Sequence, residues 1–229
     1  FAALGREQDA ESNYRTALKL DSRNTQALYE LSRIQLTSGE LSESIKTLSQ
    51  LIAIKPTFVN AYILRAQCYR KLSKTNESIA DFSAAIRLDP KCMVAYSHRA
   101  RCWNELHMPE KTAADYSSII QLEPGNSEAL MGRANAQINS KHFDKALSDL
   151  SKFEERAFSL DAQFYGTRAY ALMNSGKSQQ ALEDFSEAIK INSHVPELYK
   201  DRAQVYEQLG KHDLAEADLE TAKRLSAPR

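Results

Sequence analysis

Apolar and small residues recur along the chain in pairs of short helical stripes. Within a repeating block of 34 residues, they stand at positions 4, 8 and 11 and again at positions 20, 24, 27 and 28. This spacing has the 3.6-residue period of an α-helix that buries one face. A break near position 15 separates the two stripes, so the sequence predicts a series of helix pairs, each joined by a short turn.

Three prolines set the register of these blocks. Pro56, Pro90 and Pro124 follow similar apolar runs and are spaced 34 residues apart. Extending that spacing predicts a single array over residues 1–229. Its repeats are 1–24 (partial), 25–58, 59–92, 93–126, 127–161, 162–195 and 196–229. The repeat 127–161 contains one extra residue.

Small residues mark the predicted crossing point of the two helices in each repeat. Position 8 is Ser32, Ala66, Ala100, Ala134, Ala169 or Ala203, and position 20 is Ala10, Ser44, Ser78, Thr112, Ala146, Ala181 or Ala215. Four glycines, Gly5, Gly39, Gly176 and Gly210, fall at the break, where we expect them to cap the end of a helix. Pro109 falls near the start of a second helix, where its missing N–H has no cost.

This pattern resembles the tetratricopeptide repeat, a 34-residue helix–turn–helix with alanine at positions 8, 20 and 27 and proline at position 32. Tyr69, Trp103 and Tyr206 match the aromatic residue of the family at position 11, and Phe1 does so for the truncated first repeat. The resemblance covers the whole chain. It implies an all-α fold, a right-handed α-solenoid of stacked antiparallel helix pairs, whose inner surface is lined by the first helix of each repeat.

Two departures from the family pattern stand out. Gln35 and Gln137 replace the aromatic residue at position 11. The segment 152–158 lacks the proline and the regular apolar residues, and it contains the extra residue of its repeat. We expect altered stacking at this segment, either as a tolerated loop insertion or as a hinge or partner-binding site.

An arginine and an aspartate recur together within the repeats. Position 7 is Arg65, Arg99, Arg133, Arg168 or Arg202, and position 23 of the same repeats is Asp81, Asp115, Asp149, Asp184 or Asp218. The repeat 25–58 has neither, because Leu31 and Thr47 replace them. Since the two residues come and go together, we predict an ion pair between the two helices of one repeat, for which the planar guanidinium is well suited. A row of arginines that binds an acidic ligand is the alternative.

Composition excludes several classes of protein. The 30 basic and 30 acidic residues balance, so the chain lacks the positive field that nucleic-acid binding or a membrane surface requires. No apolar stretch is long enough to cross a membrane. Three cysteines without C-x-x-C spacing predict reduced thiols and an intracellular, cytoplasmic location. The chain starts with neither a signal peptide nor Met, so we expect further helix before Phe1 in a longer protein.

No catalytic or cofactor motif is found. The sequence contains no H-E-x-x-H, P-loop, G-x-G-x-x-G or G-x-S-x-G pattern. Four of the five histidines fall at turns or repeat ends, and His98 has no other ligand residue at suitable spacing. Cys68 and Cys102, both at position 10, are expected to be packed as small hydrophobic residues. We therefore expect no enzyme activity, no cofactor and no metal site.

The family resemblance implies that positions 2, 5, 6, 9, 12 and 13 of each first helix line a concave groove. The candidate binding residues at positions 9, 12 and 13 are Arg33, Gln67, Arg70, Arg101, Asn104, Asn135, Asn139, Tyr170, Asn174 and Gln204. We expect a continuous polar row, in which amides both donate and accept hydrogen bonds to an extended peptide. A merely solvated face is the alternative.

Charge divides the predicted groove. The lining positions of residues 25–126 contribute Arg33, Arg70, Lys71 and Arg101 against Glu30 and Glu105, and those of residues 127–229 contribute Lys200 against Glu128, Glu197, Asp201 and Glu207. We expect a ligand, or a second copy, with complementary polarity along its length. No three consecutive repeats contain the lysine, asparagine and arginine set with which one subclass of the family binds the C-terminal tails of chaperones, so those tails are not expected as ligands.

The sequence thus predicts a non-catalytic protein–protein interaction scaffold that binds peptide segments or protein surfaces within a larger complex. Two alternatives stay open. The chain is either the recruiting arm of a longer enzyme or a self-associating structural element. Lys223 replaces the leucine or isoleucine found at position 28 of five other repeats, which favours the end of the array near residue 229.

Overall fold

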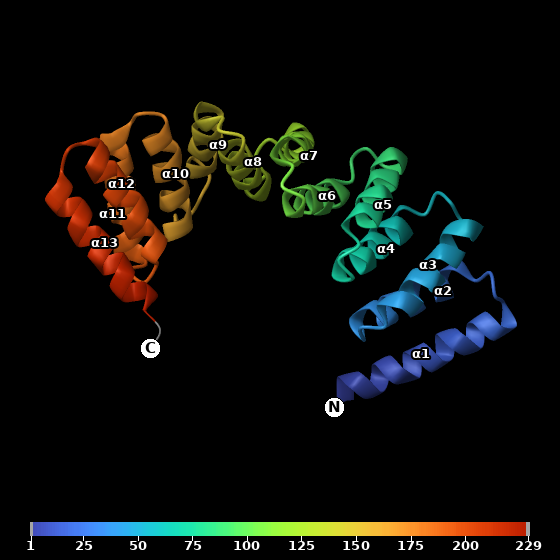
Figure 1. Cartoon of the computed structure of the whole chain (residues 1–229). Coiled ribbons are helices and arrows are strands. Elements are labelled where there is room, and N and C mark those ends of the chain that lie inside the picture. The colour runs from blue at the N-terminus through green and yellow to red at the C-terminus, as the bar shows by residue number, and fades with distance from the viewer. Residues whose placement is uncertain (1, 228–229) are drawn as a thin grey trace. The chain divides into compact units, whose positions relative to one another are not determined.

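The computed structural model describes residues 2–227, with side chains from residue 9 onward, and in this part of the chain it contains thirteen helices and no strand (Figure 1). The predicted all-α class is confirmed. The proposed aromatic match at Phe1 lies outside the described residues. The single array and its 34-residue boundaries stay a prediction.

The chain divides into two compact units, which we call unit 1 (residues 1–118) and unit 2 (residues 119–229). The helices of unit 1 are α1 (Ala2–Leu20), α2 (Thr25–Thr37), α3 (Leu41–Ile54), α4 (Val59–Lys71), α5 (Thr75–Leu88), α6 (Met93–Glu105) and most of α7 (Pro109–Leu122). Unit 2 contains the end of α7 and then α8 (Ser127–Asn139), α9 (Phe143–Glu154), α10 (Ala162–Asn174), α11 (Ser178–Ile191), α12 (Pro196–Gln208) and α13 (His212–Ser226).

Within each unit, a helix packs mainly against its neighbours in the sequence. The even-numbered helices are the predicted first helices, and each is followed by the second helix of its hairpin, as in α2–α3, α4–α5, α10–α11 and α12–α13. Successive hairpins then meet through a second helix and the next first helix, as in α3–α4, α5–α6 and α11–α12. Local contacts of this kind are those of a repeat fold.

Side chains cap the start of three first helices. Asn24, Asn126 and Asp161 each accept a hydrogen bond from the backbone N–H three residues further on. Each cap satisfies one of the donors that a helix start leaves without a partner within the helix. All three residues stand at the last position of a repeat, so the repeat boundary also sets where the next helix begins.

Every hairpin turn places position 15 in the left-handed region. Gly39, Gly176 and Gly210 have φ values of 69–85°, as predicted, but Ser73, His107 and Lys141 occupy the same place with φ values of 54–60°. At Ser73 the next N–H, that of Lys74, donates to the carbonyl of Tyr69 at 2.9 Å. This bond is part of a Schellman motif that closes the helix end.

The predicted break at Gly5 is wrong, because α1 runs without interruption from Ala2 to Leu20. Glycine permits a left-handed turn but does not impose one, since it also adopts helical dihedrals. In the hairpins where a glycine ends a helix, the apolar residues that follow it begin the stripe of the second helix. The residues around Gly5 are too few to show whether such a stripe begins there.

Small residues form the centre of each hairpin. Ser32, Ala66, Ala100, Ala134, Ala169 and Ala203 at position 8 are at most 1% exposed, and their partners at position 20 are at most 3% exposed: Ser44, Ser78, Thr112, Ala146, Ala181 and Ala215. The hydroxyl of Ser78 donates to the carbonyl of Ala66 at 2.9 Å, and that of Ser44 donates to the carbonyl of Ser32 at 2.8 Å. These short side chains let the two backbones approach, and the bond fixes where they cross. Cys68 and Cys102 are fully buried, as predicted, and burial raises the pKa of both thiols.

Candidate functional site: the first-helix faces

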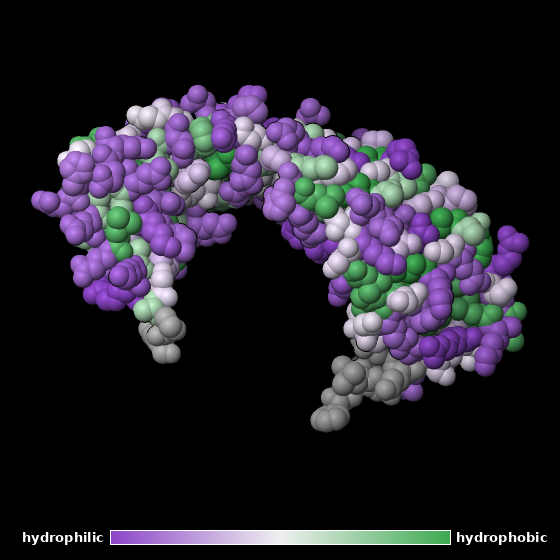
Figure 2. All heavy atoms as spheres, in the orientation of Figure 1, coloured by the Kyte–Doolittle hydropathy of each residue, from purple (hydrophilic) through white to green (hydrophobic). Residues whose placement is uncertain are grey.

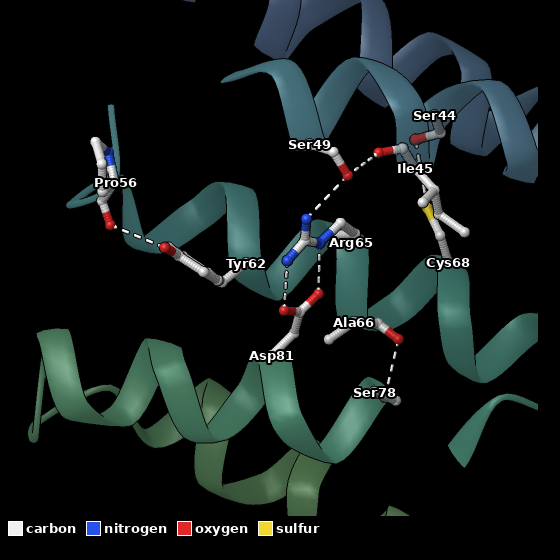
Figure 3. A network of polar contacts seen from close by, with 10 residues as sticks. All are labelled: Ser44, Ile45, Ser49, Pro56, Tyr62, Arg65, Ala66, Cys68, Ser78 and Asp81. Carbon is white, nitrogen blue, oxygen red and sulfur yellow. Dashed lines mark hydrogen bonds and ion pairs between the residues drawn. The ribbon is translucent and has the colours of Figure 1, made fainter. Parts of the chain in front are cut away.

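The five predicted arginine–aspartate pairs all form between the two helices of one hairpin. In Arg65, Nε donates to one carboxylate oxygen of Asp81 at 2.7 Å and Nη2 donates to the other at 2.8 Å (Figure 3). The other four pairs repeat this two-bond geometry at 2.6–2.9 Å. The carboxylates are at most 10% exposed. The Nε and Nη2 donors of each arginine are therefore already bonded within the protein, which argues against a row of arginines that binds an acidic ligand.

The same arginines also join one hairpin to the next, which the sequence pattern did not predict. Nη1 of Arg65 donates to the hydroxyl of Ser49 on the preceding helix α3 at 2.9 Å. Ser49 in turn donates to the carbonyl of Ile45. Arg99 and Arg202 make equivalent bonds to Ser83 and Ser186. A serine at position 25 was the signal that could have revealed this link.

The inserted segment changes this link in unit 2. Nη1 of Arg168 donates to the carboxylate of Glu154 at 2.7 Å rather than to a serine hydroxyl. Glu154 is the last residue of α9, which is the shortest helix among those described. The link between hairpins at 152–158 therefore uses a carboxylate in place of a hydroxyl, and the altered stacking expected there stays a prediction.

The hairpin α2–α3 lacks the arginine–aspartate pair and has an uncharged hydrogen bond between its two helices instead. Thr47 of α3 donates its hydroxyl to the side-chain oxygen of Gln35 on α2 at 2.9 Å. Gln35 is buried, so this bond satisfies a polar group that would otherwise be costly to desolvate. Gln35 therefore replaces the aromatic residue of the family with a polar contact between the two helices.

Aromatic rings flank the arginines and help to fix them. The guanidinium of Arg65 lies within 6.0 Å of the ring centres of Tyr62 and Tyr69, and Arg202 lies 5.8 Å from Tyr199 and Tyr206. These distances allow cation–π attraction. The hydrogen bonds to Asp81 and Asp218 raise the pKa of Arg65 and Arg202 above the ordinary value. These two guanidinium groups therefore stay charged across the physiological pH range.

The predicted binding positions lie on the opposite side of each first helix from the arginine at position 7. On a helix, a residue two places after position 7 lies about 200° further around the axis. Since position 7 faces the second helix, positions 9, 12 and 13 face outward on the opposite side. We call this outward side of α2, α4 and α6, and of α8, α10 and α12, the first-helix face of unit 1 and of unit 2.

The candidate binding residues occupy these faces with different exposure. In unit 1, Arg33, Arg101 and Asn104 are exposed and Gln67 and Arg70 are half-buried. In unit 2, Asn139, Tyr170, Asn174 and Gln204 are exposed and Asn135 is half-buried. Each unit thus brings five of the ten candidates to its own face. Asn174 donates to the carbonyl of Tyr170 at 2.8 Å, which holds its side chain along the helix.

Several of the candidate basic residues already have acidic partners. Arg33 contacts Glu30 at 2.9 Å, and Arg70 of α4 contacts Glu105 of α6 at 3.3 Å. Both pairs lie on the first-helix face of unit 1 and are at least one-fifth exposed. The net positive count of this face is unchanged, but two of its cations are neutralised locally.

The expected continuous polar row is wrong at the start of unit 1. A cavity of about 370 Å³ opens there between α1, α2 and α4. Its walls include Tyr14, Ile34, Leu36 and Leu64, with Glu30 and Arg33 beside them. Leu36 stands at position 12 and Leu64 at position 6, which are both groove positions of the family. Neither residue is among the ten polar or aromatic candidates for binding.

A second cavity lies on the first-helix face of unit 2. It measures about 350 Å³ and is lined by Glu128 and Met131 of α8, by Phe153 of α9, by Gln163 of α10, and by Ser159 and Asp161 of the segment that joins α9 to α10. The inserted segment therefore contributes part of a cavity wall. Phe158, within the same segment, is fully exposed. Both interpretations of the insertion, a tolerated loop or a hinge or partner-binding site, stay predictions.

The visible surfaces of the two units differ in hydropathy. Hydrophobic residues gather over α2–α5 on the face of unit 1 shown in Figure 2, whereas hydrophilic residues cover most of the visible face of unit 2.

In unit 2, Asp201 of α12 is half-buried beside Glu197. Burial first, and the neighbouring carboxylate second, raise the pKa of Asp201 above its ordinary value.

Among residues 2–227, no group of three or more histidine, cysteine or acidic residues is placed to hold a metal ion. No described helix is long and apolar enough to cross a membrane. His98 stacks on Phe82 with ring centres 5.4 Å apart, and its Nε2 lies 3.3 Å from the amide nitrogen of Gln67.

Paired helices that cross at small residues, joined through neighbouring hairpins, define an α-helical repeat protein. Family models of the tetratricopeptide repeat match residues 1–68, 59–92 and 167–228. The chain belongs to the tetratricopeptide repeat family. Proteins of this family are generally non-catalytic, and the fold is in general that of a protein-interaction scaffold.

Solved structures share this fold. YrrB, described as a TPR protein with an unusual peptide-binding site, is similar with a TM-score of 0.71 and 15% identity, over 90% of this chain and 97% of that one. A tetratricopeptide repeat protein from Parabacteroides merdae is similar with a TM-score of 0.65 and 19% identity, over 100% and 90%. A curated relative, the 58 kDa phosphoprotein of Plasmodium berghei, is 30% identical over 88 residues, which span 38% of this chain and about a fifth, 21%, of that protein.

Proposed function

We propose that this chain is a non-catalytic protein–protein interaction scaffold that binds extended peptide segments through its first-helix faces, within a larger complex in the cytoplasm. One observation carries the proposal. Exposed amide side chains stand on successive first helices, with Asn139 on α8, Asn174 on α10 and Gln204 on α12. Amides donate and accept together, so such a row matches the alternating groups of a peptide backbone. The likeness to YrrB, a TPR protein with a peptide-binding site, supports this role.

Charge gives the face of unit 2 a preferred ligand. Its lining positions carry Glu128, Glu197, Asp201 and Glu207 against a single Lys200, and Lys200 itself lies 3.7 Å from Glu197. A basic segment would be attracted to this excess of carboxylates, and it would offset the repulsion from Glu197 that, after burial, raises the pKa of Asp201. We propose that the ligand is basic where it meets unit 2 and acidic where it meets unit 1.

The amide row is tested with a triple alanine variant at Asn135, Asn139 and Asn174. Its matched control is a triple alanine variant at Gln179, Glu183 and Lys190, which are exposed on the second helix α11. Pull-downs with both variants and the wild type should lose the bound peptide or protein only with the first variant. Equal capture by all three folded proteins would contradict binding through the first-helix face.

The proposed polarity is tested with a synthetic lysine-rich peptide. Calorimetric titration should detect binding that weakens with salt, because exposed charges are screened. The variants Glu197→Lys and Glu207→Lys should weaken binding, whereas Glu183→Lys on α11 should not. Unchanged affinity in all three variants would remove the acidic face of unit 2 as the binding surface.

A further inference from the structure

The cavity on the first-helix face of unit 2 combines apolar walls with an acidic rim. Met131 of α8 and Phe153 of α9 are half-buried, whereas Glu128 of α8 and Asp161, the residue before α10, are exposed. The volume of about 350 Å³ lies at the lower end of the range typical of ligand sites. The cavity therefore suits one long side chain rather than a folded segment.

This cavity lies in line with the amides of the proposed function. On an α-helix, residues spaced three or four apart share one side. Such a stripe on α8 runs through Glu128, Met131, Asn135 and Asn139. Met131 stands one turn before Asn135, a rise of about 6 Å along the helix axis. A peptide bonded to Asn135 thus passes the cavity within reach of one of its own long side chains.

Charge favours a cation in this cavity over an apolar side chain. An apolar group would remove water from the carboxylates of Glu128 and Asp161 without replacing their hydrogen bonds, which is unfavourable. The first turns of α8 and α10 also line the cavity, but a helix start carries only about half a positive charge, less than one carboxylate. Arg156 of the joining segment is not a wall residue, and its guanidinium instead lies against Gly125, 3.1 Å from where a β-carbon would stand.

The capping role of Asp161 leaves one carboxylate oxygen for a ligand. Its Oδ1 accepts the N–H of Phe164 at 2.8 Å, and the carboxylate makes no other bond to the described part of the chain. The chain also shows how an arginine uses a ring and a carboxylate together. Arg168 lies 4.9 Å from the ring centre of Phe164 while it bonds to Asp184. Phe153 and Asp161 offer the same combination in the cavity.

We propose that the cavity binds the side chain of one arginine in the basic segment of the peptide ligand. The guanidinium bonds to Asp161 beside Glu128, and the aliphatic stem packs along Met131 and Phe153. This anchor rests on the proposed function, because the peptide that supplies the arginine is the one bound by the amide row. Arginine fits better than lysine, since its planar fork bonds two oxygens and is more weakly hydrated than an ammonium.

Capped tripeptides test the cavity without the amide row. In an NMR titration of the isotope-labelled chain, glycine–arginine–glycine should shift the amide signals of Met131, Ser159 and Gln163, with a dissociation constant of about 1–10 mM. Tripeptides with lysine or leucine in place of arginine should bind at least about threefold more weakly. No shift of these signals, or equal binding of the lysine or the leucine tripeptide, would overturn the proposal.

Asp161→Asn removes the charge and keeps the helix cap, because Asn24 and Asn126 make the same capping bond at the ends of their own repeats. It should weaken binding of the arginine tripeptide at least about threefold and leave the leucine tripeptide nearly unchanged. Asp144→Asn, the same change at an exposed residue of α9 outside the cavity, is the control and should alter neither. Equal affinity of the wild type and Asp161→Asn for the arginine tripeptide would also overturn the proposal.

Longer peptides separate this anchor from the proposed function. When arginine replaces one lysine at a time in the lysine-rich peptide, one placement should bind about three- to tenfold more tightly than the others to the wild type, but not to Asp161→Asn. If all placements bind equally and Glu197→Lys still weakens them, the anchor is wrong and the proposed function stands. If none binds while the arginine tripeptide still shifts the cavity signals, the proposed function is wrong and the arginine site is retained.

Discussion

At the scale of single residues, the hairpin turns share one backbone conformation at position 15 but differ in the side chain found there. Position 15 adopts positive φ in all six hairpins, yet it is glycine only at Gly39, Gly176 and Gly210. For other residues the left-handed conformation costs roughly 1–2 kcal/mol. Glycine avoids this cost but loses more conformational entropy on folding, by roughly 0.5–1 kcal/mol. At position 15 the φ penalty that glycine avoids is larger than the entropy that it loses, so glycine is the more stable residue there.

We therefore expect Ser73→Gly to stabilise the chain by about 0.5–1 kcal/mol, and Gly39→Ala to destabilise it by about 1 kcal/mol. A β-carbon on Gly39 would meet no atom within 4 Å, so its cost is conformational rather than steric. Urea unfolding followed by circular dichroism measures both changes. Ser73→Ala is the control and should change little, because alanine has the same φ penalty. A loss of stability in Ser73→Gly would contradict this account.

The arginine–aspartate pairs allow a measurement of coupling. In a double-mutant cycle of Arg99→Ala and Asp115→Ala, we expect a coupling free energy of about 1–3 kcal/mol, because both hydrogen bonds are charge-assisted and the carboxylate is 5% exposed. The exposed pair of Lys46 and Glu43 on α3 is the reference cycle and should give no more than about 0.5 kcal/mol. Coupling as weak in the first cycle as in the second would remove the pair as a stabilising link.

Asp201 should make stability depend on pH. Because its pKa is raised in the folded chain, the folded state holds a proton that the unfolded chain has already released. Stability therefore falls as the pH rises above about 4, until the folded carboxyl has also ionised. Asp201→Asn should then be more stable than the wild type at pH 7, by about 0.5 kcal/mol, and no more stable at pH 3. Urea unfolding at the two pH values measures this difference, and equal differences at both would contradict it.

At the scale of elements, the sequence predicted the helices better than the surface they form. Small residues at positions 8 and 20 and the pairing of Arg65 with Asp81 follow from spacing, because each is set within one hairpin. The bond from Arg65 to Ser49 was missed, since it joins two hairpins and the repeated serine at position 25 is meaningful only once the contact between hairpins is known. The cavity at Leu36 and Leu64 was missed for a similar reason, because its walls come from three helices.

Two aromatic residues near the junction of α9 and α10, one at the end of α9 and one in the segment after it, have opposite roles. Phe153 stacks on the buried Phe164 with ring centres 5.5 Å apart, whereas Phe158 is fully exposed. Phe153→Ala should cost about 3 kcal/mol because it opens a cavity beside Phe164. Phe158→Ala should change the free energy of unfolding by less than about 0.5 kcal/mol.

Thermal and urea unfolding of the two variants, with Ala157→Ser as a control, provide the comparison. If Phe158→Ala were as costly as Phe153→Ala, its ring would belong to the core and not to a binding surface. Retained stability together with lost capture of a bound protein would favour the role in partner binding.

At the scale of the whole molecule, stability should be local. Contacts within each unit run mainly between helices that are adjacent in sequence, so each hairpin depends on its own pairs and on its neighbours. Asp81→Asn removes the charged partner of Arg65 and should cost about 1.5–3 kcal/mol in that hairpin. Amide hydrogen exchange in α4 and α5 should accelerate roughly 10- to 100-fold, with a smaller effect in α3 and α6.

Exchange in α10–α13 should stay within error of the wild type, because those helices are joined by their own arginine–aspartate pairs at Asp184 and Asp218. Glu77→Gln, an exposed change on the same helix α5, is the control and should leave every helix unchanged. Mass spectrometry of peptides from each helix resolves the pattern. An equal acceleration in all helices would mean that the chain opens in a single cooperative step, and it would contradict nearest-neighbour stability. A change confined to α3–α6 instead makes each hairpin a separate unit of opening, so a partner bound to one first-helix face stabilises that region without altering distant helices.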